Sequence, residues 1–361
     1  LYTFVFHFPA VGGGGGMEHS YGTAISFPAG QLDNGFEDLE NTIAHEFFHL
    51  WNVKRIRPQG LEPVDYVHGN DTSGLWFCEG VTSTYAELTL LRAGLISAAE
   101  FFSHLAAAIS ELERRPARHF QSVALSGREA WLEKYPDYRR PERSISYYNN
   151  GELLGYILDL AIRQASGNRN SLDDLMRLLD TQFARQHRYY TDADLERLIA
   201  SLGPGDDWAR SFFQDDVTGT ADLDYQHYLG AAGLRLVKTE TLQPAWGIET
   251  VRNPGGLIQV TSVEPGSGAA QAGLESGDVL LEINGQPLYA APGEVLGLKP
   301  GERLKLRVRR GTRVLTVRLT LGARREVRYR VEEAPNATAE QLAIRAGWLY
   351  GRRPAGGGAA P

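Results

Sequence analysis

The spacing of apolar positions in the first quarter of the chain predicts a mixture of strand and helix. Residues 2–8 are rich in aromatic and β-branched side chains, as a strand is, and a glycine-rich turn follows them. Two later segments, 38–53 and 75–92, carry apolar residues at helical spacing. Residues 1–95 are therefore expected to form a first domain that combines a small sheet with two helices.

The pattern changes twice in the remainder of the chain. From about 97 to 225 apolar residues recur at intervals of three and four, as in 153–161, which predicts amphipathic helices. After about 226 short alternating runs are separated by turn dipeptides such as Asn284-Gly285, which predicts strands. We therefore expect an α+β multidomain protein with a helical domain over 96–225 and a β-rich domain after it.

Composition narrows the class of protein only slightly. The chain has 361 residues, 42% of them hydrophobic, with 37 Lys and Arg against 44 Asp and Glu and a net charge of −7. Two or three domains are expected, since single cores stop growing near ~250 to 300 residues. One cysteine excludes an intrachain disulfide framework. The sequence contains no run of ~18 consecutive apolar residues, so we expect no membrane-spanning helix.

The start of the sequence predicts that a preceding segment is missing. The chain begins at Leu1 rather than Met, enters a strand at once, and lacks the features of a secretory signal. An upstream part of the protein is therefore expected. The compartment stays open between cytoplasm and periplasm, because a single cysteine suits both.

Positive charge is concentrated in 299–330, which holds twelve Lys or Arg and two Glu. Such a stripe could bind nucleic acid. However, Leu304, Leu306 and Val308 alternate with the basic residues, as in a strand with one buried and one solvated face. We favour the solvated strand and expect no nucleic-acid partner.

The strongest chemical signal is His45-Glu46-Phe47-Phe48-His49, within the segment that Asp38 can cap. At 3.6 residues per turn the two imidazoles lie on one helix face, about one turn apart, and can reach a single Zn²⁺. Glu46, next to the first imidazole, can serve as general base toward a water at the metal. Two histidines on a helix can also be ordinary core or surface residues.

A catalytic zinc site needs a third protein ligand from elsewhere in the chain. Glu79 is the candidate, because a carboxylate flanked by Trp76 and Phe77 would be costly to bury without a cation. The adjacent Cys78 could ligate instead, but neighbouring helix positions diverge by about 100°, so at most one of the two faces the metal.

Glycines occupy positions 12–16, shortly before Glu18. Such a run can be a flexible linker. Glycines at the end of a strand also let a substrate backbone approach closely, and Glu18 would then offer a carboxylate beside it.

Together, the segments 15–19, 45–58 and 75–80 resemble the glycyl aminopeptidase family of zinc metallopeptidases, which belongs to the gluzincins. The resemblance covers 1 to about 225 and implies a thermolysin-like catalytic domain, 1–95, completed by the helical domain. It also implies an N-terminal β domain upstream, in line with the missing segment expected above.

The resemblance assigns roles to these residues. It implies one Zn²⁺ per chain, held by His45, His49 and Glu79, with Glu46 as the base.

Further roles concern the substrate. The resemblance implies that Glu18 binds the free α-amino group of a peptide and that Gly15 and Gly16 line it. In the relatives a Tyr before a helix hydrogen-bonds the oxyanion, which corresponds to Tyr148, although the adjacent Tyr147 stays an alternative.

Residues 228–322 resemble a PDZ domain of the bacterial protease type, and the segment 263–285 carries the likeness. Its carboxylate-binding loop is expected at Trp246, Gly247 and Ile248, where backbone N–H groups could hold a peptide C-terminus. A purely structural PDZ domain is the alternative. Residues 323–361 are expected to be a C-terminal extension with a disordered end.

The sequence therefore predicts a zinc aminopeptidase that removes N-terminal residues from peptides with a free N-terminus. Relatives favour Gly or Ala at that position. Two alternatives stay open: a zinc endopeptidase whose PDZ domain recruits protein substrates, and a non-catalytic PDZ adaptor on a peptidase scaffold. Neither a nucleic acid nor a membrane is expected as a partner.

Overall fold

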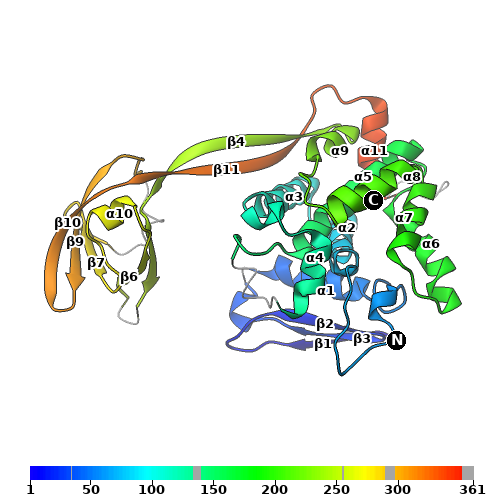
Figure 1. Ribbon diagram of the computed structural model, residues 1–361, viewed down its shortest axis with the longest axis horizontal. Coiled ribbons are helices and arrows are strands. Elements are labelled where there is room, and N and C mark those ends of the chain that lie inside the picture. The colour runs from blue at the N-terminus through cyan, green and yellow to red at the C-terminus, as the bar shows by residue number, and fades with distance from the viewer. Residues whose placement is uncertain (34, 133–139, 254–255, 289–296, 352–361) are drawn as a thin grey trace. The chain divides into compact units, whose positions relative to one another are not determined.

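The structure is a computed structural model that describes residues 1–33, 35–132, 140–253, 256–288 and 297–351 (Figure 1). The chain divides into two compact units. The first consists of Leu1–Val237 and Tyr329–Pro361, and the second of Lys238–Arg328. The first two predicted domains, 1–95 and 96–225, thus form one unit instead of two. The second unit begins and ends later than the predicted limits of 228 and 322. The predicted disordered end, 354–361, lies outside the described residues.

A small sheet opens the first unit. Strand β3 (Gly22–Ser26) lies between β1 (Thr3–His7), to which it is parallel, and β2 (Gly15–His19), to which it is antiparallel. Helix α1 (Phe36–Phe48) lies against this sheet (Figure 1), and Leu39 joins Ile25 and Phe27 in a small core beneath it. Because β3 is central, β2 is an edge strand with one backbone side unpaired by the sheet.

The main core belongs to the helices of the first unit, among which α5 (Tyr147–Ser166) is buried along most of its length. The other α-helices of this unit are α2 (Val81–Ala93), α3 (Ala98–Glu113), α4 (Val123–Arg128), α6 (Leu172–Gln182), α7 (Asp192–Ser201), α8 (Asp206–Ser211), α9 (Tyr225–Ala231) and α11 (Ala339–Tyr350). The first unit also contains two π-helical turns, η3 (Trp76–Gly80) and η8 (Phe212–Val217). Its described residues include the short 3₁₀ turns η1 (Ala29–Gln31), η2 (Gln59–Leu61), η4 (Pro116–His119), η5 (Glu129–Trp131) and η7 (Ala184–Gln186).

The two helices expected near the site differ from their predicted limits. The first ends at Phe48 rather than near 53, and Gly35, not Asp38, occupies its N-cap. The second predicted helix is two elements, the π-helical turn η3 followed by α2. Both differences place predicted metal ligands at helix ends or irregular turns.

Helix α11 was predicted only as part of a C-terminal extension, yet it belongs to the main core. Trp348 is fully buried, and its ring lies 5.4 Å from that of Phe101 and 5.9 Å from that of Tyr156. The segment that follows the second unit therefore completes the first one.

The second unit is a β-rich domain. Its sheet has the order β10 (Arg313–Thr320), β9 (Arg303–Arg310), β7 (Val279–Ile283), β6 (Ile258–Val263) and β5 (Ile248–Arg252), with β8 (Gln286–Pro287) paired to β7. Helix α10 (Gly268–Gln271) is short. Strands β4 (Leu234–Ala245) and β11 (Gly322–Glu333) pair as a separate two-stranded sheet.

The basic stripe lies on β9 as a solvated strand. Leu304, Leu306 and Val308 are buried, while the basic residues between them are exposed. Among the described residues, no helix is long and apolar enough to cross a membrane.

Candidate metal centre

Three side chains converge between α1 and η3. The Nε2 atoms of His45 and His49 are 3.0 Å apart, and the Oε2 atom of Glu79 lies 3.2 Å from the first and 3.3 Å from the second. His49 is buried, and the other two are largely shielded from solvent. The spacing of four residues in α1 puts the imidazoles on one face.

Hydrogen bonds at the far side of each imidazole fix which nitrogen faces the centre. His49 Nδ1 donates to the backbone oxygen of Asn52 at 2.7 Å. The hydroxyl of Ser83 donates to the backbone oxygen of Glu79 and is therefore an acceptor for His45 Nδ1, 3.3 Å away. Neutral imidazoles held in this way point two Nε2 lone pairs and one carboxylate oxygen at the same space. Three acceptors without a donor between them repel one another unless a cation lies there.

Glu79 owes its position to a close contact between two backbones. A Cβ added at Gly80 would lie 2.3 Å from the Cα of Gly151, and one added at Gly151 would lie 2.4 Å from the backbone oxygen of Trp76. Only glycines allow η3 to lie this close to α5. The π-helical turn then aims Glu79 at the two histidines.

Asn52 ties the turn after α1 to η3. It is fully buried, and its side-chain amide donates to the backbone oxygen of Phe77 at 2.8 Å and lies 3.2 Å from the hydroxyl of Thr82. Since its own backbone oxygen accepts from His49, one residue links both halves of the centre. Outer contacts of this kind orient metal ligands.

Glu46 lies beside the three convergent atoms. Burial raises its pKa to about 7; His49 opposes this shift, and the carboxylates of Glu18 and Glu79 add to it. Its Oε2 atom is buried without a hydrogen-bond partner in the described part of the chain. A Cβ at Gly16 would lie 2.2 Å from the Cδ and Oε1 atoms of Glu46, so this glycine leaves the space that the carboxyl group fills. A carboxylate with a pKa near neutrality can take up and release protons.

Glu18 reaches the same place from the edge strand β2. Ligand atoms of Glu18, Glu46 and His49 all lie within 4.8 Å of one another. Glu18 is also paired with Lys54, whose Nζ is 3.0 Å from its Oε1. Gly15 and Gly16 lie on β2 beside it, and the unpaired side of this strand can add a peptide strand.

The two tyrosines at the start of α5 have different surroundings. The ring of Tyr148 lies 6.0 Å from that of His45, centroid to centroid, whereas Tyr147 is buried in the main core. Of the two, Tyr148 is thus placed toward the convergent side chains.

The predicted PDZ loop lies between β4 and β5. Trp246 is buried in the core of the second unit, which explains a large residue in this loop. Gly247 has φ +69°, and a Cβ there would lie 2.3 Å from the Cβ of Ser267. Ile248 begins β5, an edge strand of the sheet.

Sequence reasoning missed Asn52, Ser83 and Lys54. Asn52 and Lys54 follow the second histidine within the segment 45–58, which could have drawn attention to them. Ser83 contacts His45 and the backbone oxygen of Glu79. The local sequence hints at the second contact alone, since Ser83 follows Glu79 by one helical turn.

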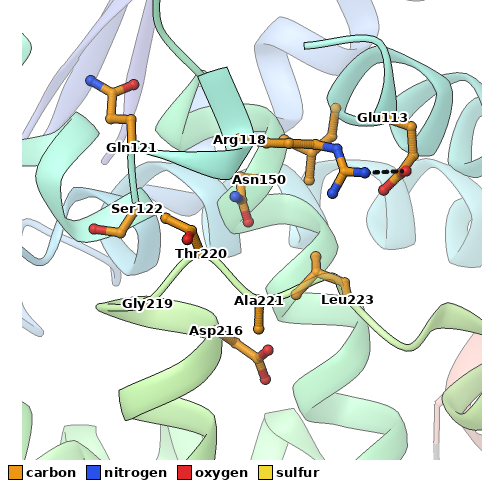
Figure 2. A pocket seen from close by; sticks show the side chains of 11 residues that line it. Glu113, Arg118, Gln121, Ser122, Asn150, Asp216, Gly219, Thr220, Ala221 and Leu223 are labelled. Carbon is orange, nitrogen blue, oxygen red and sulfur yellow. Dashed lines mark ion pairs between the residues drawn. The ribbon is translucent and has the colours of Figure 1, made fainter. Parts of the chain in front are cut away.

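Two cavities of the first unit differ in size. The one in Figure 2 is lined by Asn150, Asp216 and the ion pair of Arg118 with Glu113, 3.1 Å apart, and has about 10 Å³. This volume admits about one water molecule and no peptide. The other, of about 490 Å³, is lined by Lys54 and the residues that follow it.

Comparison with known families separates the two units. The sequence model of the M61 glycyl aminopeptidases matches residues 38–154, and that of a PDZ domain matches residues 259–310. The first match contains the predicted metal ligands, and the second lies within the second unit.

Solved structures and curated proteins add partial relatives. A crystal structure of an aminopeptidase N family protein from Idiomarina loihiensis superposes with a TM-score of 0.70 at 24% identity, over 96% of this chain and 62% of that one. This likeness shows the fold. The periplasmic serine endoprotease DegQ of Escherichia coli is 37% identical over 65 residues, 17% of this chain and 14% of that protein. A probable DegP-like periplasmic serine endoprotease of Pseudomonas fluorescens is 33% identical over 109 residues, 29% and 22% of the two lengths. The chain thus spans less than two thirds of each.

Proposed function

Because this chain belongs to the glycyl aminopeptidase family and carries a PDZ domain, we propose that it is a zinc-dependent aminopeptidase. The single observation that carries the proposal is the convergence of the acceptor atoms of His45, His49 and Glu79 within 3.0 to 3.3 Å of one another. Two imidazoles and a carboxylate are the donor set of a catalytic zinc, and they leave a fourth position open.

Zinc bound here would polarise the scissile carbonyl and make a water molecule more acidic. The residues of the chain would do the rest. Glu46, beside the three convergent atoms, would accept the proton of the attacking water and pass it to the leaving amine. Tyr148 would donate its hydroxyl proton in a hydrogen bond to the oxyanion, a contribution of about 3 kcal/mol.

The aminopeptidase assignment depends on Glu18. Its carboxylate lies near Glu46 and beside the edge strand β2, so a peptide strand paired to β2 would bring its ammonium group to Glu18. Gly15 and Gly16 would line that strand. Small N-terminal residues such as Gly or Ala are the proposed preference.

A comparison of free and N-acetylated peptides tests this assignment against the endopeptidase alternative. We expect hydrolysis of free Gly- and Ala-peptides, and at least ~100-fold slower hydrolysis of the acetylated forms, since a neutral end cannot pair with Glu18. Equal rates for both forms would favour the endopeptidase alternative.

Glu46→Gln separates metal binding from turnover. The variant should keep one zinc per chain by metal analysis and lose at least ~1000-fold in kcat, because only the base is removed. Retained turnover contradicts the mechanism. A wild-type chain with well under one zinc, and no activity on adding zinc, would support the adaptor alternative.

For the PDZ domain we propose that a peptide C-terminus binds beside Ile248, on the edge strand β5. Backbone N–H groups of the loop Trp246-Gly247-Ile248 would hold its carboxylate.

A further inference from the structure

The larger cavity of the first unit is strongly basic. It has about 490 Å³ and is lined by the cationic side chains of Lys54, Arg55, Arg57, Arg185 and Arg188, by His187, and by a single carboxylate, that of Asp180. The chain as a whole carries a net charge of −7. A concave surface of one sign inside a protein of the other sign concentrates its field on a ligand of opposite charge.

Not all of these charges are neutralised by the protein. Lys54 pairs with Glu18, Arg57 with Glu62, and Arg185 with Asp180. In the described part of the chain, no carboxylate lies within ion-pair distance of Arg55 or Arg188. Arg55 donates to the backbone oxygen of Leu50 at 2.9 Å. Arg188 lies 5.3 Å from the ring centroid of Phe183. Both guanidinium groups keep donors for a ligand.

The cavity walls are held together by backbone hydrogen bonds. The N–H of Tyr190 donates to the oxygen of Arg57 at 3.1 Å, and the N–H of Gln59 donates to the oxygen of Tyr190 at 2.8 Å. The segment that carries Arg185 and Arg188 is thereby fixed to the segment that follows the second histidine. The arginines face the cavity from a pre-arranged frame, which lowers the entropic cost of binding.

Lys54 links the cavity to the metal centre. Its Nζ lies 3.0 Å from Glu18, and Glu18 lies within 4.8 Å of Glu46 and His49. We propose that a peptide held at the centre extends into this cavity and that the cavity is a subsite for carboxylate groups of the peptide, so that the protein favours acidic peptides.

The location of the peptide rests on the proposed function, but binding can be measured without turnover. Glu46→Gln protein is titrated by calorimetry with Ala-Ala-Glu-Glu-Ala-Ala and with its Gln-Gln counterpart, each as free acid and as C-terminal amide. At low salt the Glu peptide should bind ~10-fold more tightly, and 0.3 M NaCl should remove most of the difference. If affinity depends on Glu rather than Gln, the cavity binds side-chain carboxylates. If it depends on the free acid rather than the amide, the cavity binds the C-terminal carboxylate.

The double substitution Arg55→Gln with Arg188→Gln should reduce the Glu-to-Gln preference to about 2-fold or less. The matched control, Arg143→Gln with Arg169→Gln, also removes two exposed positive charges, from residues outside the cavity lining, and should keep it.

Equal affinity for all four peptides overturns the inference, as does a preference that survives the double substitution. Binding of a 20-residue oligothymidylate that is stronger than that of the Glu peptide and lost in the same variant overturns the peptide assignment. A protein that binds the acidic peptide but hydrolyses none overturns the proposed function and leaves the subsite standing.

Discussion

A methyl group at position 16 would occupy the space that the carboxyl end of Glu46 now fills. The added Cβ would lie 2.2 Å from Cδ and Oε1 of Glu46 and 2.3 Å from Cγ, whereas ordinary contacts begin near 3.4 Å. Glu46 or strand β2 must therefore move by about 1 Å, which follows from 3.4 − 2.2 Å. A 1 Å misplacement of a catalytic group costs ~100-fold in rate, equivalent to about 2.7 kcal/mol.

We therefore expect Gly16→Ala to lower kcat for a Gly-peptide by ~100-fold while zinc content stays at one per chain. The three atoms nearest the added methyl all belong to Glu46 and none to a predicted ligand, so metal binding should be spared. Gly13→Ala is the matched control, because a Cβ there has no atom within 4 Å and φ is not positive. The reasoning is refuted if Gly16→Ala keeps more than a third of the control's kcat, or if it loses its zinc.

Three further predictions address the surroundings of the site and the second unit. Asn52→Ala should weaken zinc affinity by ~10- to 100-fold in a competition assay with a chelator, because His49 loses its fixed orientation; unchanged affinity would contradict the proposed link. Tyr148→Phe should reduce kcat by ~100-fold and Tyr147→Phe should not, and the reverse result would move the oxyanion role. Burial alone would raise the pKa of Asp278, but hydrogen bonds from Arg310 lower it. The stabilisation is therefore fully present above the ordinary Asp value of about 4 and is lost as the pH falls through the lowered pKa of the folded state. In urea unfolding, wild type should exceed Asp278→Asn in stability at pH 6, and the difference should narrow as the pH falls below about 4. A constant difference would refute the assignment.

The fold class and the PDZ domain could be predicted because their signals are local. Alternation at Leu304, Leu306 and Val308 marks one buried face, and the same three side chains are buried in β9. Strand β11 shows why the predicted boundary at 322 fell short. A two-stranded sheet leaves much of both faces in water, so its strands need no regular alternation of apolar and polar residues.

In the candidate site, too, the features with a local sequence pattern could be predicted and those that depend on distant segments could not. The i, i+4 spacing of His45 and His49 suffices to put both imidazoles on one face, and the structure brings Glu79 to them. Their role as zinc ligands stays a prediction. The buried hydrogen bond of Asn52 to Phe77 joins residues 25 positions apart in the sequence. The backbone contact of Gly80 with Gly151 joins residues 151 − 80 = 71 positions apart. No local pattern encodes which partner such a residue will meet.

Helix α11 determines how the second unit can be removed without damage to the first, because it follows the second unit in the sequence but packs in the core of the first. The chain leaves the first unit after Val237 and returns to it at Tyr329, so the second unit is an insertion with two covalent tethers. Ending the chain at Arg328 would also delete Trp348 and Ile344, both buried in the main core of the first unit. Losing a buried tryptophan alone costs ~3 to 5 kcal/mol, a large share of the stability of a domain. An internal deletion that joins residue 237 to residue 329 through a short linker would keep that helix. A protease cut at one tether would likewise leave the two units connected through the other.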